Sequence, residues 1–188
     1  MAKLKSFEKI IPDELVLATD HYFAHADLKQ SRQALREFQE KQPAVAEFAT
    51  SLGKELSEEG RNLLVYLSMV LWKIFDSAAK GAFPSLQMKE LEKMFEEIEN
   101  FFLQMKHVSE EEMLTRFQEK FPIQQPFVYQ YLFQKLLKPD STSAWPENEL
   151  LVLFMALSSL LAVFSRKFEE LPDSAGENLT NRTEKDLE

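Results

Sequence analysis

The sequence LEKMFEEIENFFLQM at residues 91–105 carries the clearest helical pattern in the chain. Its apolar residues recur at steps of three and four, which places them on one face of an α-helix. They are Leu91, Met94, Phe95, Ile98, Phe101, Phe102 and Met105. Acidic residues fill the opposite face, and Pro84-Ser85 precedes the pattern. We therefore predict an amphipathic helix over about 85–106 that begins near Ser85.

Helix start and stop signals divide the rest of the chain in the same way. Asp27 with Gln30 and Ser109 with Glu112 have the spacing of capping boxes, and Ser57 precedes two glutamates. Gly81 predicts the end of the helix that Ser57 opens. Inside the helix that Asp27 opens, a Gln-Pro pair at 42–43 must kink or restart it, because proline cannot donate to the preceding turn. The chain contains only four glycines, which suits helices.

Two helices, around residues 62–76 and 149–164, are apolar on nearly every side. The run Leu150–Phe164 is about 22 Å long as a helix, which is shorter than the roughly 30 Å of a bilayer core. Two serines interrupt it, at 158 and 159, and we expect them to bond to helix carbonyls rather than to act as nucleophiles. We predict that both helices are buried neighbours at the centre of the protein.

Short sequences recur in the same order along the chain. FQEK at 38–41 returns at 117–120, QP at 42–43 returns at 125–126, and LLV at 63–65 returns at 150–152. The second copy carries residues 121–124 as an insertion. Ordered matches of this kind indicate an internal duplication.

These patterns predict an all-α, single-domain helical bundle of six or seven helices over residues 1–171. It would consist of two related three-helix halves, about 27–81 and 109–170, with the helix of about 85–106 as connector. The polar segment 172–188 holds too few apolar residues to fold and is expected to be a disordered acidic tail.

Composition excludes several classes of function. A formal net charge of −9 argues against nucleic acid and against an anionic membrane as partners. The chain has no cysteine, so disulfides, thiolate metal sites and cysteine nucleophiles are excluded. Without disulfides or an apolar stretch after the basic N-terminus, we expect a cytoplasmic protein.

No motif predicts a catalytic, cofactor-binding or metal site. His21 and His25 are four residues apart, which places both imidazoles on one helix face, but the glutamate of a zinc-protease motif is missing. Glu92, Glu96 and Glu99 lie on the polar face of the 85–106 helix, where a solvated surface is expected.

The leading hypothesis is a non-enzymatic, regulatory protein-interaction protein, with a homodimer as one form of it. Its candidate interface anchors are the aromatic residues Trp72, Trp145, Phe127, Tyr129 and Tyr131. The alternative is a binder of an apolar small molecule between the two helical halves, lined by Met and Phe side chains. A metal-dependent helical-bundle enzyme is the third hypothesis, and it requires inward-facing carboxylates.

Overall fold

The computed structural model describes residues 9–105, 107–137 and 145–172, and within them the chain is helical with no strand. It has the helices α1 (Asp13–His25), α2 (Leu28–Lys41), α3 (Pro43–Leu52), the short 3₁₀ helix η1 (Gly53–Glu55), α4 (Glu58–Ala78), α5 (Met88–Gln104), α6 (Glu110–Lys120), α7 (Pro126–Leu137) and α8 (Glu147–Glu169). The all-α class predicted from the sequence is confirmed. These residues form eight α-helices rather than six or seven, because the proline at 43 starts a separate helix and does not merely kink one. The predicted tail lies outside the described residues from 173 onward.

The predicted start signals act through the expected hydrogen bonds. Asp27 and Gln30 form a complete capping box, with side chain to backbone distances of 2.7 and 2.8 Å. Ser57 accepts a hydrogen bond from the N–H of Gly60 at 3.1 Å. At the end of α4 the chain takes up positive φ at Gly81, which glycine adopts without a side-chain clash. Local chemistry therefore sets most of the helix ends.

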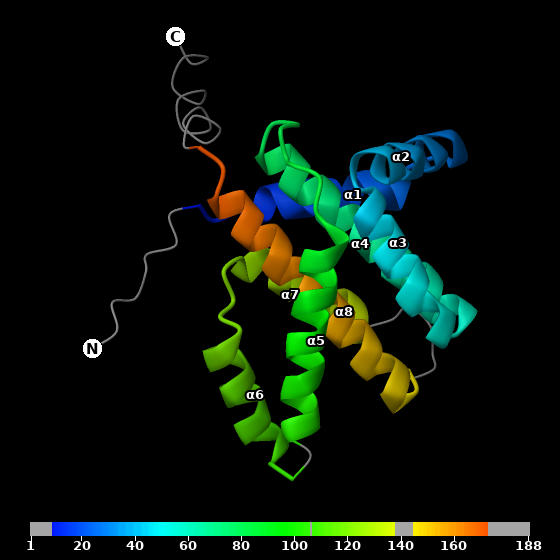
Figure 1. Ribbon diagram of the computed structural model, residues 1–188. Coiled ribbons are helices and arrows are strands. Elements are labelled where there is room, and N and C mark those ends of the chain that lie inside the picture. Colours follow the sequence, from blue (N-terminus) through cyan, green and yellow to red (C-terminus); the bar gives the residue numbers. More distant parts are fainter. Residues whose placement is uncertain (1–8, 106, 138–144, 173–188) are drawn as a thin grey trace.

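The two apolar helices, α4 and α8, pack against each other at the centre of the protein (Figure 1). Their contact includes Phe75 of α4 and Phe164 of α8, whose ring centroids are 5.3 Å apart and whose side chains are fully buried. The prediction that these helices are neighbours in the core is confirmed. Helix α8 is the one helix among the described residues that is long and apolar enough to cross a membrane, and 56% of that stretch is buried inside the protein.

A buried glutamine sets the start of α5. The side-chain amide of Gln42 donates to the carbonyl of Pro84 at 2.9 Å, and its oxygen accepts from the N–H of Leu86 at 3.0 Å. These bonds hold the chain extended before the helix, so α5 begins at Met88 and not near Ser85 as the sequence predicted.

A second buried glutamine makes the same pair of bonds at the other end of the fold. The amide of Gln125 donates to the carbonyl of Lys9 at 2.7 Å, and its oxygen accepts from the N–H of Ile11 at 2.8 Å. That extended segment leads directly into α1. Each glutamine precedes the proline that opens a helix, α3 in one case and α7 in the other.

Helix α6 is the least embedded of the helices. Together with the end of α5 it projects from the body of the protein (Figure 1). Phe117 anchors it, with ring contacts to Phe101 of α5 at 5.6 Å and to Phe154 of α8 at 5.3 Å. These side chains belong to a small second cluster beside the main core, which also includes Ile98 and Met155. The arrangement leaves apolar surface of α7 and α8 without a covering helix.

Candidate functional site

An apolar groove of about 580 Å³ lies between the α5–α6 hairpin and the facing ends of α7 and α8. Its lining residues are Glu99, Phe102, Leu103 and Met105 at the end of α5, Val108 in the turn, Met113 and Leu114 of α6, Phe133, Leu136 and Leu137 of α7, and Leu150, Leu151, Phe154 and Met155 of α8. Glu99 is the one charged residue among them. We call this feature the apolar groove.

Four leucines on the groove remain exposed to solvent. The exposed fractions are 51% for Leu103, 49% for Leu114, 63% for Leu137 and 41% for Leu151. Isolated exposed leucines are common, but four leucines that line one concave surface form an exposed apolar patch, whose contact with water is unfavourable. Methionines at three positions of the lining add side chains that can adapt to the shape of an occupant. The groove therefore has the properties of a binding surface for an apolar partner.

The connection between α6 and α7 is longer than the one between α2 and α3. Helix α2 ends at Lys41 and α3 begins two residues later, and α2 contacts both α3 and α4. Residues 121–125 separate α6 from α7.

The acids of α5 form an exposed stripe that leads into the groove. Glu92, Glu96 and Glu99 are three or four residues apart on one face of the helix, and all three are exposed. None of them forms an ion pair with a described residue. Leu103, the next residue of this face, lines the groove. The groove thus has an acidic border along α5.

His21 and His25 lie together on α1 but away from any cluster of acids. Their rings stack with centroids 4.1 Å apart, and Nδ1 of His25 donates to the carbonyl of His21 at 2.9 Å. Both side chains are exposed. Among the described residues, no group of three or more His, Cys, Asp or Glu residues could hold a metal ion.

The five aromatic residues predicted as interface anchors have different environments. Trp72 is fully buried and Tyr131 is 6% exposed, so both belong to the core. Tyr129 and Trp145 are half-buried against that core. Phe127 is 40% exposed on α7. None of the five lines the apolar groove.

Tyr131 is the centre of a polar cluster between α7, α1 and α4. Its hydroxyl donates to Asp20 at 2.9 Å, and the ammonium of Lys135 lies 3.1 Å from the same carboxylate oxygen. Burial raises the pKa of Tyr131, and the nearby hydroxyl of Tyr66 and the charge of Asp20 raise it further. The folded protein therefore favours the neutral phenol.

We expect Tyr131 to make the protein less stable at alkaline pH. Because its pKa is raised in the folded state, its contribution to stability is complete below the pKa of the unfolded chain, about 10, and is lost as the pH rises towards the folded value. The free energy of unfolding is measured in urea at about pH 8 and about pH 11. Its decrease between these pH values should be smaller for Tyr131→Phe than for the wild type. Tyr22→Phe, at an exposed tyrosine of α1, is the control, and its decrease should equal that of the wild type. Equal losses in all three proteins would contradict the expectation.

The sequence patterns did not predict the groove, because its lining residues have the apolar character and spacing of core residues. Phe102 and Met105 belong to the apolar stripe of α5, and Leu150 and Phe154 belong to the apolar run of α8.

The adjacent serines of α8, Ser158 and Ser159, have different surroundings. Ser159 donates to the carbonyl of Met155 at 2.7 Å, as the sequence predicted. Ser158 instead lines a smaller cavity of about 260 Å³ between α5, α6, α7 and α8. The lining residues of this cavity and of the groove all fall within residues 94–166, so neither space lies between the halves that the sequence suggested.

No protein family, curated protein or solved structure matches the chain.

Proposed function

We propose that the protein is a non-enzymatic interaction module that holds an amphipathic helix of a protein partner in the apolar groove. The single observation that carries this proposal is the apolar groove of about 580 Å³, whose lining has one charged residue and four exposed leucines. A helix that presents apolar side chains at steps of three and four would cover those leucines and fill the groove. The methionines Met105, Met113 and Met155 would adjust to its side chains.

Charge complementarity specifies the partner helix further. Glu99 lines the groove, and Glu92 and Glu96 precede it on the same exposed face of α5, without an ion pair among the described residues. The whole chain carries a formal net charge of −9. A partner helix with lysines or arginines beside its apolar face would place positive charge against this border. The proposed occupant is therefore a basic amphipathic helix.

A synthetic helical peptide tests this proposal directly. The probe is a peptide of about 16 residues, roughly 24 Å as a helix, with leucines on one face and lysines on the other. The matched control peptide has glutamate at every lysine position. With ¹³C-methyl-labelled methionine, the lysine peptide should shift the signals of Met105, Met113 and Met155 saturably and leave that of Met69, buried in the main core, unchanged.

Two pairs of protein variants separate groove binding from general attraction to an acidic protein. Leu151→Asp should weaken the lysine peptide about tenfold, the loss of about 1.4 kcal/mol, whereas Leu35→Asp, at an exposed leucine of α2, should not. Glu92→Gln, Glu96→Gln and Glu99→Gln together should weaken it more than the control set Glu40→Gln, Glu47→Gln and Glu55→Gln, which removes the same charge from exposed positions elsewhere.

The opposite results would overturn the proposal. Equal losses from the groove and control variants would mean that charge alone attracts the peptide. Groove methionine signals that change with protein concentration in the absence of peptide would mean that a second copy of the chain is the occupant.

We also propose that the fold arose by internal duplication, with units of four helices rather than three. Gln42 and Gln125 each lie next to a proline, are fully buried, and bond to two backbone groups of the extended segment that leads into the other unit's first helix. Under this proposal α1–α4 correspond to α5–α8, so the helix predicted as a connector is the first helix of the second unit. Phe75 and Phe164, in contact at the centre, would be equivalent residues, which pairs α4 with α8 at a separation of 89 residues and not the 87 of the LLV repeat.

A further inference from the structure

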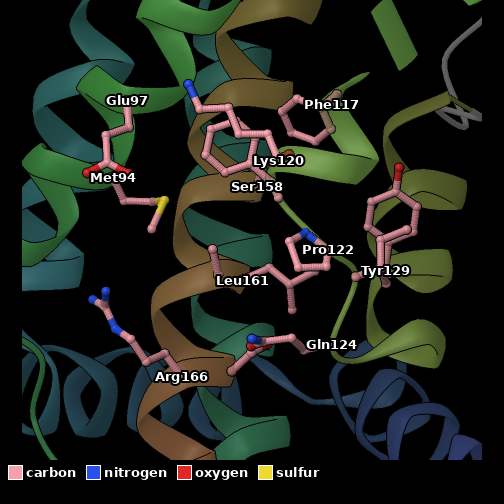
Figure 2. Close-up of a pocket in the computed structure, with 14 residues that line it drawn as sticks. Met94, Glu97, Phe117, Lys120, Pro122, Gln124, Tyr129, Ser158, Leu161 and Arg166 are labelled. Carbon is pink, nitrogen blue, oxygen red and sulfur yellow. The ribbon is translucent and has the colours of Figure 1, made fainter. Parts of the chain in front are cut away.

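A second, separate space lies on the same side of α8 as the groove. This cavity of about 260 Å³ shares no lining residue with the groove. Leu161 of α8 lies between Met94 of α5 on one side and Tyr129 of α7 on the other (Figure 2), and Ala162 also lines the cavity. An apolar cavity of about 150 Å³ is already large enough for benzene. The space is therefore sufficient for one aromatic ring with substituents.

Two polar atoms of the cavity wall have no hydrogen-bond partner among the described residues. They are the hydroxyl oxygen of Ser165 and the side-chain amide oxygen of Gln124. Ser165 is 1% exposed. Two other buried helical serines, Ser68 and Ser159, donate to the carbonyl four residues earlier at 2.7 Å, whereas Ser165 makes no such bond. Its hydroxyl therefore has no partner among the described residues, and Ser165 is one of the residues that line the cavity.

Under the internal duplication proposed above, with Phe75 equivalent to Phe164, the first unit fills the corresponding place with an indole ring. Trp72 lies three residues before Phe75 and packs on Phe38 of α2, with ring centroids 5.8 Å apart. Three residues before Phe164, the second part has Leu161, which lines the cavity. The smaller leucine, and the inserted residues 121–124 that also line the cavity, leave about the space of an aromatic side chain.

The mouth of the cavity carries charges of both signs. Glu97 of α5, Lys120 of α6 and Arg166 of α8 lie around it (Figure 2). Glu97 pairs with Lys93 at 3.9 Å, and Arg166 lies 3.9 Å from Glu90. Two of these three charges already have an oppositely charged neighbour. The unpartnered polar atoms of the wall belong to the neutral side chains of Ser165 and Gln124, which suits a neutral ligand.

We propose that this cavity binds one neutral, planar aromatic molecule that carries a hydroxyl group, in the manner of a small phenol. The ring replaces the aromatic side chain that Leu161 lacks, and it contacts Met94, Phe117 and Leu161. A hydroxyl group both donates and accepts, so it suits the amide oxygen of Gln124 and the hydroxyl of Ser165.

Two probes that differ only by the hydroxyl group test the site. Protein with ¹³C-methyl-labelled methionine is titrated with p-cresol and, separately, with toluene. We expect p-cresol to shift the Met94 signal saturably, with the groove methionines Met105, Met113 and Met155 unaffected. Toluene should bind about fivefold more weakly, which is the worth of one ordinary hydrogen bond.

Three variants give the proposal its controls. Ser165→Ala should remove most of the preference for p-cresol and leave toluene binding unchanged, and it should fold because its hydroxyl has no partner in the described protein. Ser159→Ala, at a serine outside the cavity lining, should keep the preference. Leu161→Trp should abolish binding of both probes by filling the space, and Ala162→Leu serves the same purpose if the tryptophan variant does not fold.

The proposal is overturned if p-cresol gives no saturable shift of Met94 up to its solubility limit, since the cavity then holds only water. It is also overturned if Ser165→Ala keeps the full preference for p-cresol, or if the shifts are confined to the groove methionines.

Discussion

Replacing Phe75 with alanine should lower the free energy of unfolding by about 3–5 kcal/mol. Phe75 is fully buried where α4 meets α8, and its ring contacts those of Phe83, Phe164 and Phe168 at centroid distances of 5.7, 5.3 and 5.7 Å. Truncation removes an aromatic ring from the middle of this cluster and leaves a cavity that three large neighbours cannot close without moving.

Urea unfolding followed by circular dichroism measures the effect, and the slope of the transition checks that the unfolded states are comparable. Phe127→Ala is the matched control, because it removes the same ring from a position that is 40% exposed. It should cost less than about 1 kcal/mol. Equal losses of stability in the two variants would contradict the prediction, because burial of the Phe75 ring between α4 and α8 would then add nothing to its contribution.

Sequence patterns predicted the local features of the fold well. The capping boxes and serine caps predicted where α2, α4 and α6 begin, because these signals act within a few residues of the chain. The two long apolar helices were predicted to be neighbours, and Phe75 meets Phe164 in the core. The helix ends were predictable because short-range hydrogen bonds set them. The pairing of α4 with α8 was predictable because burial brings the most apolar surfaces together.

Features that depend on distant residues were not predictable in this way. The start of α5 was wrong by about one turn because Gln42, more than forty residues earlier, bonds to the backbone of Leu86. The side chain of Trp72 was a candidate interface anchor and is buried beneath α2. A periodic pattern says which face of a helix is apolar, but it does not say whether another helix covers that face.

The candidate site illustrates this limit most clearly. Leu103 and Leu151 have the same apolar character as buried leucines elsewhere on α5 and α8, yet they are about half exposed at the groove. What distinguishes them is that they line the groove, where no helix among the described residues covers them. Whether a helix covers an apolar face becomes visible only when the helices are placed in space.

The second large effect should come from the two buried glutamines. Changing Gln125 to leucine removes the hydrogen bonds to the carbonyl of Lys9 and from the N–H of Ile11, and Ile11 is 1% exposed. An ordinary hydrogen bond contributes about 1 kcal/mol and an unsatisfied buried group costs about 1–3 kcal/mol, so the variant should lose about 2–4 kcal/mol of stability. Gln42→Leu should lose a similar amount through Pro84 and Leu86.

Two further sets of variants separate hydrogen bonding from packing. Gln39→Leu and Gln118→Leu change exposed glutamines of α2 and α6 and should shift stability by less than about 0.5 kcal/mol. Gln125→Glu is nearly the same size as the wild-type residue, but as a carboxylate it cannot donate to the carbonyl of Lys9. Burial and that carbonyl favour the neutral acid in the folded state, which raises the pKa of the new carboxyl group.

A raised folded-state pKa gives the glutamate variant a characteristic pH dependence. The variant should be less stable than the wild type by only a small free energy of unfolding below the pKa of an unfolded glutamate, about 4.3. This loss of stability should grow as the pH rises through the pKa of the glutamate in the folded protein. Gln42→Glu should behave in the same way, because its bonds to an extended segment have the same geometry. Equivalent roles in a duplicated fold would be supported by two results. The variants at Gln42 and Gln125 should lose stabilities that agree within about 1 kcal/mol, and both losses should become smaller in acid. A large, pH-dependent loss at one glutamine and none at the other would remove the strongest support for that duplication, because the two hydrogen-bond pairs would then differ in the one property that equivalence requires.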